Sequence, residues 1–341
     1  MKMKIHNILA ACLLLVLSAC YKEIPFRGME TDPQLFFQCL PGAQDTTVFW
    51  LRTTIPVNQE LKEKEIVNPK MTFKVNGKEV ELQLNAGESS TFPSEAYFAV
   101  EPLKPGDKLE FHAEADGFDP ISAQTVIPQE IQNPTLSSSM IPGPNPYYYV
   151  AALDDRASQG ISTEVAEFKI SFKDPPGVRD CYMVQVLQYV YHNNGQILPY
   201  YTQSVAYVVP SLETNVFEQT QTNVLLANHY SPWQTIEFER TGYSSLIMFF
   251  DDKEFDGQSY TKNIMVNNPY SASQYITKYR FRLYRVSEEL YKYAKAWDTA
   301  RKAEYSDFPS ATPFMSYNNI EGGNGIFAGV AVYDSGMIEI E

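Results

Sequence analysis

Apolar and polar residues alternate with a period of two through much of this chain, and turn signals interrupt the alternation about every ten residues. One alternating run spans residues 71–75 and the next spans 80–84. Asn76-Gly77 lies between them, a pair that tolerates the positive φ angles of a type I′ hairpin turn. A period of two puts alternate side chains on one face, so these runs predict a sheet with one buried face.

Further strands are predicted at 97–100 and 109–115, separated by turns rich in proline and glycine. Short strands with frequent turns and no helical period are typical of β-sandwiches. We therefore expect a mainly β protein whose first folded unit, residues 34–128, is an immunoglobulin-like sandwich.

Prolines cluster after this unit, at Pro134, Pro142, Pro144 and Pro146. Proline has no backbone N–H to donate to a sheet, and it stiffens extended segments. We therefore predict a Pro-rich linker over 129–146, with the boundary between two domains there.

Residues 147–341 predict a second sandwich-like, mainly β domain, in which the alternation over 166–172 is the clearest strand signal. One short helix is predicted near 287–303. Ser287 is a favourable N-cap there, and Glu288 and Glu289 suit the positive first turn.

The first 20 residues predict membrane attachment. An apolar run at 8–16 follows two lysines, and it is far short of the roughly 20 residues of a membrane-spanning helix. Leu17-Ser18-Ala19-Cys20 comes next and resembles a bacterial lipobox. This resemblance implies that the cysteine thiol receives diacylglycerol and that the new N-terminus is acylated, with palmitate or a similar chain.

We accordingly predict a signal peptide at 1–19, lipid attachment at Cys20 and a polar tether at 20–33. Several acyl chains make a stable anchor. An ordinary secretory signal that ends at Ala19 is the alternative. Charge directly behind the cysteine, at Lys22-Glu23, weakly resembles export signals for the cell surface, so we expect the outer membrane, with the surface face favoured.

The composition is acidic. Loss of Lys2 and Lys4 with the signal leaves 25 basic and 41 acidic residues, a formal charge of −16. Phosphate backbones require the opposite field, so this charge argues against nucleic acid as a partner. About 320 residues remain, enough for two domains.

Two cysteines remain in the folded part, Cys39 and Cys181. They lie in apolar, strand-like runs of different predicted domains. These surroundings favour two buried free thiols over a disulfide, although an extracytoplasmic compartment would permit a bridge.

Sequence motifs for catalysis are missing. Three histidines remain after cleavage, His112, His192 and His229, and the chain has neither His-Glu-x-x-His nor Gly-x-Ser-x-Gly. We predict a non-enzymatic protein without a catalytic residue. An enzyme whose site is built from scattered residues is a further alternative.

One acidic cluster has ligand-like spacing. Asp252, Glu254 and Asp256 with Gly257 fit the opening of a calcium loop, but Asn263 stands where the bidentate acid is due. The pattern favours an acidic turn without cofactor, and a Ca²⁺ site at these three residues is the alternative.

Tyrosine pairs and triplets, such as Tyr147-Tyr148-Tyr149 and Tyr200-Tyr201, suit either a core or a platform for a glycan or peptide ligand. Gly322, Gly323 and Gly325 precede a β-rich run. This context favours a tight turn over a phosphate-binding loop.

Three phrases of the C-terminal half resemble a known family together with the lipobox and Ala123-Gln124-Thr125-Val126-Ile127-Pro128. They are Phe249-Phe250-Asp251-Asp252 with Phe255-Asp256-Gly257, Val286-Ser287-Glu288-Glu289-Leu290-Tyr291-Lys292-Tyr293, and Asn318-Asn319-Ile320-Glu321-Gly322-Gly323-Asn324-Gly325-Ile326-Phe327-Ala328-Gly329. The set resembles a Bacteroidetes outer-membrane lipoprotein family of uncharacterised function.

Members of that family are often encoded beside TonB-dependent receptors, and no catalytic residues are established for it. The resemblance therefore implies an accessory binding component of a TonB-dependent uptake system, with the β-barrel receptor as partner. A fimbrial or adhesin-like surface lipoprotein is the alternative.

Overall fold

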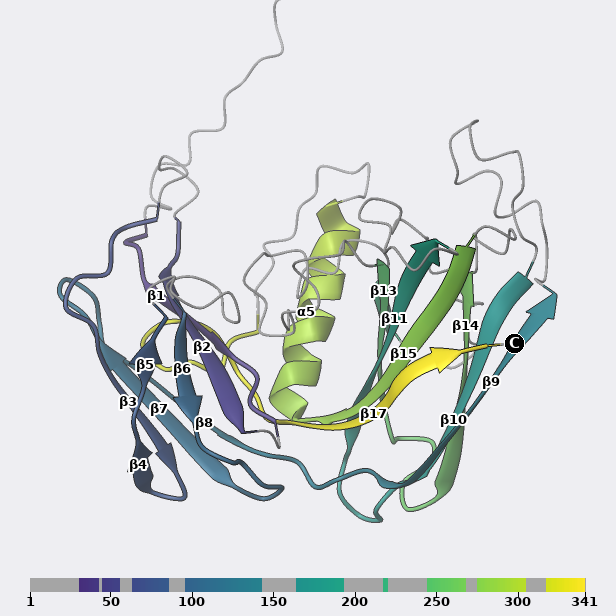
Figure 1. Ribbon diagram of the computed structural model, residues 1–341. Coiled ribbons are helices and arrows are strands. Elements are labelled where there is room, and N and C mark those ends of the chain that lie inside the picture. Colours follow the sequence, from purple (N-terminus) through teal and green to yellow (C-terminus); the bar gives the residue numbers. More distant parts are fainter. Residues whose placement is uncertain are drawn as a thin grey trace, which may run out of the picture.

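The computed structural model describes residues 31–42, 45–55, 63–85, 96–142, 164–192, 217–219, 244–267, 275–304 and 317–340. It confirms a mainly β fold with sandwich-like layers and one helix among these residues (Figure 1). No helix in the described part of the chain is long and apolar enough to cross a membrane.

The N-terminal sandwich joins two sheets, in the orders β16-β1-β2-β6-β5 and β4-β3-β7-β8. Its strands are β1 (Leu35–Cys39), β2 (Thr46–Thr53), β3 (Lys70–Val75), β4 (Lys78–Val80), β5 (Gln83–Leu84), β6 (Tyr97–Val100), β7 (Lys108–Glu114), β8 (Ile121–Val126) and β16 (Asn324–Phe327).

Phenylalanines from both sheets fill the core of this sandwich. Phe37 of β1 stacks on Phe111 of β7 with ring centroids 3.7 Å apart, and Phe49 meets Phe73 edge to face. The predicted hairpin turn is confirmed, because Asn76 and Gly77 have φ angles of 52° and 80° between β3 and β4.

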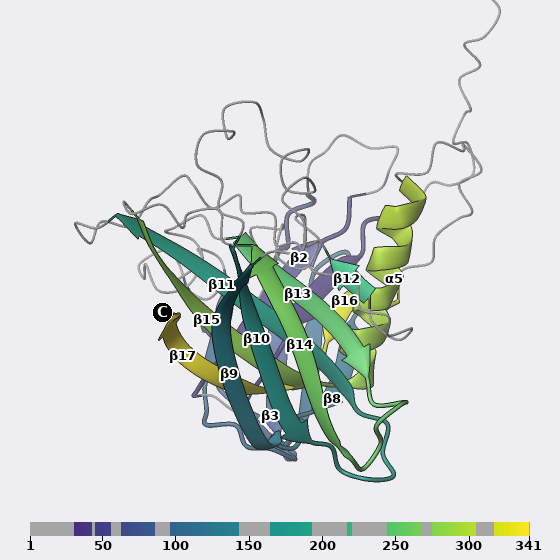
Figure 2. The ribbon, with the colours of Figure 1, turned by 90° about the vertical axis from the view of Figure 1, so that its right-hand side faces the viewer.

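The C-terminal sandwich places the sheet β14-β10-β9 over the sheet β12-β13-β11-β15-β17 (Figure 2). Its strands are β9 (Gln132–Pro142), β10 (Glu164–Lys173), β11 (Cys181–His192), β12 (Phe217–Gln219), β13 (Ser244–Asp251), β14 (Ser259–Asn267), β15 (Tyr275–Val286) and β17 (Val330–Glu339). The predicted alternation over 166–172 is confirmed, since every second side chain from Ala166 to Phe172 is buried between the two layers.

Helix α5 (Glu288–Glu304) confirms the predicted helix and packs against the second face of the larger sheet. Leu290 and Ala294 lie there with Cys181 and Met183 of β11. The carbonyl of Ser287 accepts a hydrogen bond from the Tyr291 amide, but its buried hydroxyl has no hydrogen-bond partner. The residue therefore starts the helix without the side-chain cap that its type predicts.

The predicted linker over 129–146 is instead a strand from Gln132 to Pro142. This strand, β9, pairs antiparallel with β10 from Glu164↔Pro142 to Lys173↔Gln132. It is an edge strand, where proline is tolerated because an outward-facing position needs no donor. Proline content therefore indicated a connector where the structure has a sheet edge.

The chain returns to the N-terminal sandwich near its C-terminus. β16 pairs parallel with β1, from Phe36↔Asn324 to Cys39↔Phe327, and brings Ile326 and Phe327 into buried positions. We call residues 317–330 the return segment. The domain division at 129–146 stays a prediction, yet residues assigned to 147–341 complete the first sandwich.

Both cysteines in the described chain are free and buried, as predicted. Burial raises the pKa of the Cys39 thiol, and it raises the pKa of Cys181 to about 12. Both thiols are therefore protonated at physiological pH, and the two side chains contribute to core packing.

Candidate functional site: a buried carboxylate cluster and a polar groove

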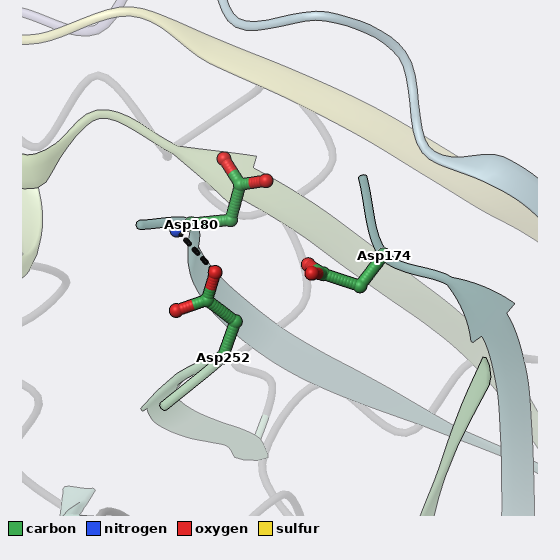
Figure 3. Close-up of side chains that lie close together, drawn as sticks. All are labelled: Asp174, Asp180 and Asp252. Carbon is green, nitrogen blue, oxygen red and sulfur yellow. Dashed lines mark hydrogen bonds between the residues drawn. The ribbon is translucent and has the colours of Figure 1, made fainter. Parts of the chain in front are cut away.

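Three carboxylates converge where strands of the C-terminal sandwich end (Figure 3). Asp174 follows β10, Asp180 precedes β11 and Asp252 follows β13. One oxygen of each lies within 4.8 Å of the others, and the three residues are only 0%, 6% and 2% exposed. We call this set the carboxylate cluster.

Each member of the carboxylate cluster has a partner in the protein. Asp180 accepts from Arg285 Nε at 2.9 Å and Nη2 at 2.6 Å, a buried bidentate pair. Asp174 accepts from the Tyr182 hydroxyl at 2.5 Å and the Gly257 amide at 2.9 Å. Asp252 accepts from the Asp180 amide at 2.8 Å.

Burial sets the electrostatics of the cluster. Desolvation raises the pKa of Asp180 against the opposing effect of Arg285, and it also raises the pKa of Asp252. Desolvation and the bond to Asp174 together raise the pKa of Tyr182. Burial thus opposes ionisation of Asp180 and Asp252, and Arg285 partly offsets this effect at Asp180.

An oxygen set of this kind suits a hard cation such as Ca²⁺ in residue type. All three carboxylates nevertheless have hydrogen-bond partners within the protein, and Arg285 is the counter-ion of Asp180. These contacts give the cluster a structural role, because they link the ends of β10, β11, β13 and β15.

The three residues of the alternative Ca²⁺ site, Asp252, Glu254 and Asp256, do not come together in the structure. Asp252 points into the cluster, whereas Glu254 and Asp256 are exposed, and Asp256 accepts from the Gly177 amide at 2.7 Å. The turn after β13 sends these side chains in different directions. Sequence reasoning missed Asp174 and Asp180 because they precede Asp252 by more than 70 residues, although both flank strands at the turn Pro175-Pro176-Gly177.

A groove of about 640 Å³ lies on the N-terminal sandwich, between its β3-β7-β8 face and the start of α5 with the return segment. Side chains alternate along β7, so Leu109, Phe111 and Ala113 enter the core while Glu110 and His112 point outward. The outward face of these strands forms one wall of the groove.

Glu289 of α5 and three residues of the return segment, Tyr317, Asn319 and Glu321, form the opposite wall. The two walls are joined at Ser122, whose amide and carbonyl both bond to the Glu321 backbone at 3.1 and 2.8 Å. The Ser122 hydroxyl also donates to the Glu321 carboxylate at 3.1 Å. The groove therefore has a fixed floor.

Of the residues singled out in the sequence, His112 lines the groove, where its ring nitrogen Nε2 lies 3.2 Å from Glu114 Oε1. Cys20, His229 and the tyrosines at 147–149 and 200–201 lie outside the described residues. Groove residues were missed because outward polar positions of a strand resemble any solvated face.

The glycines of the return segment make close backbone contacts. A Cβ atom at Gly323 would lie 2.6 Å from the Leu35 carbonyl oxygen, and one at Gly325 would collide with that of Phe37. A tight turn was predicted here; docking against β1 is the further reason for glycine.

A family model described as "Domain of unknown function (DUF4249)" matches residues 21–335. No curated protein matches the chain. Among solved structures, the adhesin InvE of Yersinia pseudotuberculosis is 11% identical with a TM-score of 0.20, over 74% of this chain and 55% of that one.

The major pilin SpaD of Corynebacterium diphtheriae is 11% identical with a TM-score of 0.21, over 64% of this chain and 56% of that one. This chain thus spans about half the length of these proteins. A likeness at this level carries no argument about function.

Proposed function

The chain belongs to this family of unknown function, and we propose that it is a lipid-anchored surface protein that captures a ligand without chemical change. The polar groove carries this proposal, because its size suits a small ligand and its floor is held by the Ser122–Glu321 contacts. Cys20 supplies the anchor, and the tether at 20–33 keeps the groove near the membrane.

We propose that the captured ligand is part of a surface outside the cell, so that the protein acts like an adhesin. A rigid β-sandwich that presents polar side chains from neighbouring strands suits non-covalent contact rather than bond breaking. Attachment at the membrane also raises the effective concentration of binding sites, so weak individual contacts suffice.

The test compares cells that display the wild-type chain with cells that display Gln124→Trp. Gln124 is exposed in the groove, so the indole blocks it without entering the core. Lys108→Trp is the matched control, because Lys108 is exposed on the same sheet outside the groove. We expect adhesion to mucin- and matrix-coated surfaces to be lost for Gln124→Trp and kept for Lys108→Trp.

Equal adhesion by Gln124→Trp and the wild type, at equal surface levels, would overturn capture in the groove. Cys20→Ala tests the anchor separately, and the variant should appear in the soluble fraction without the mass of the acyl chains. Retention in the membrane fraction at unchanged mass would contradict lipidation at Cys20.

Accessory binding for a TonB-dependent importer is the second candidate function, supported by the family resemblance and by the geometry that the lipid imposes. Mild detergent extraction of the cross-linked, tagged protein should then recover a receptor-sized β-barrel. Recovery of the protein alone would exclude this role and leave the adhesin-like one.

A further inference from the structure

Six outward side chains of β3, β7 and β8 form a regular array on one wall of the groove. The strand registers pair Thr72 with His112 and His112 with Ser122. They likewise pair Lys74 with Glu110 and Glu110 with Gln124. The two rows thus offer hydroxyl, imidazole, ammonium, carboxylate and amide groups at the spacing of neighbouring strands.

Most side chains of this array make no hydrogen bond within the described part of the protein. Within the described chain, the side chains of Thr72, Lys74, Glu110 and Gln124 have no hydrogen bond or ion pair, although Lys74 and Glu110 lie directly opposite each other. The wall therefore presents donors and acceptors that a ligand can satisfy.

The charge of the groove restricts that ligand. Glu110 on one wall and Glu289 and Glu321 on the other outnumber the ammonium of Lys74. The formal charge of the whole chain, −14, has the same sign. Phosphorylated, sulfated or uronic-acid ligands are disfavoured by this field.

The lining also lacks the apolar pocket that anchors a peptide side chain. Phe111 and Ala123 are its apolar strand residues, and the Phe111 ring is turned into the core. Peptide affinity depends on a few desolvated aromatic or aliphatic anchors. A ligand covered with hydroxyl groups needs only donors, acceptors and an aromatic ring such as Tyr317.

We propose that the groove binds a neutral carbohydrate, with Glu110, Gln124 and Lys74 as hydrogen-bonding partners of its hydroxyl groups. This inference rests on the proposed function, because it names the ligand class for the same groove. Carboxylate and ammonium groups make the stronger, charge-assisted bonds, while the hydroxyl and amide side chains set the register of the sugar.

The test uses the full lipidated chain in detergent micelles and a set of free oligosaccharides. Maltotriose, mannotriose, lactose and triacetylchitotriose are the neutral probes, a hyaluronan oligosaccharide is the acidic probe and trilysine is the basic peptide. We expect at least one neutral probe to bind by calorimetry or ligand-observed NMR, and the acidic probe not to bind. Glu110→Gln should weaken the neutral probe about tenfold, the loss of one charge-assisted hydrogen bond.

Glu130→Gln is the control, because it removes the same charge from an exposed position after β8, outside the groove. Equal weakening by both variants would overturn the inference by assigning the effect to overall charge. If trilysine binds and no neutral probe does, the proposal of a carbohydrate ligand is wrong. The proposal that the groove captures a ligand would then still stand. Neutral-probe binding that Gln124→Trp does not reduce would contradict both proposals.

Discussion

At the scale of single residues, the carboxylate cluster shows how burial and pairing oppose each other. Asp174, Asp180 and Asp252 are almost fully buried, and Arg285 forms an ion pair with Asp180. A buried ion pair gains little over apolar packing, but removal of one partner leaves an uncompensated charge. Arg285 is therefore the residue on which the cluster depends.

We predict that Arg285→Met lowers the free energy of unfolding at pH 7 by about 3–5 kcal/mol, measured by urea denaturation. Methionine preserves much of the side-chain volume, so the loss reports the unpaired carboxylates. Arg285→Met combined with Asp180→Asn should recover part of the loss. An Arg285→Met protein as stable as the wild type would show that the pair has no such role.

The pH dependence of stability tests Asp252. Its pKa is raised by burial, so the fold favours its protonated form. That contribution is present at acidic pH and is lost as the pH rises through the raised pKa. Asp252→Asn keeps an oxygen acceptor for the Asp180 amide and carries no charge.

We therefore expect Asp252→Asn to stabilise the protein at pH 7, with the difference vanishing at pH values below the usual pKa of aspartate. Paired thermal melts across this pH range measure it. A constant difference at every pH would contradict the assignment.

At the scale of elements, the return segment is held by side chains that imitate strand pairing. Asn319 donates to the Phe327 carbonyl at 2.8 Å and accepts from the Phe327 amide at 3.0 Å. Asn318 likewise accepts a hydrogen bond from the Ile320 amide at 2.8 Å and donates one to the Gly323 carbonyl at 2.7 Å. The segment thus arrives at β1 in a fixed shape, and its glycines let the two backbones meet.

Gly325→Ala should destabilise the protein by at least about 3 kcal/mol, because the new Cβ would collide with the Phe37 carbonyl in a residue with φ of 125°. Gly77→Ala is the control. It has φ of 80° with no atom near the new Cβ, so it should cost only about 1–2 kcal/mol. Chemical denaturation measures both losses of unfolding free energy. Equal losses would mean that glycine is required at 325 for its positive φ angle and not for the close contact with β1.

At the scale of the whole molecule, the two sandwiches share one chain path rather than standing in sequence. Ile326 and Phe327 are fully buried beside β1, and Phe327 packs edge to face on Phe37 at 5.7 Å. The Gly329 amide also donates to the Thr125 hydroxyl at 2.9 Å. Immediately afterwards, β17 pairs with β15 in the other sandwich.

A fragment of residues 34–128 should therefore fail to fold as a stable unit, because it lacks β16 and the core side chains that β16 supplies. We expect poor amide dispersion by NMR for the fragment alone and improved dispersion when a peptide of residues 317–330 is added. A well-dispersed spectrum from 34–128 alone would support the domain boundary predicted at 129–146.

The sequence alone determined what depends on neighbouring residues. Alternation placed the strands at 71–75 and 166–172, Asn76-Gly77 specified its turn, and the glutamates after Ser287 marked the helix, because backbone preference and burial pattern act over a few residues. The lipobox prediction at Cys20 is of the same local kind. The alternating run at 80–84 did not form one strand, because β4 ends at Val80 and β5 pairs with β6 in the other sheet, where Leu84 is exposed.

Tertiary structure decided the features that depend on distant residues. Only folding shows that Pro134 lies on a sheet edge, that β16 joins β1, or that Asp252 meets Asp174 and Asp180 instead of Glu254 and Asp256. The groove belongs to the same class, since Glu110 and Glu289 face one space although 179 positions separate them in the chain. The contacts that create such sites depend on chain closure and packing, which local spacing does not encode.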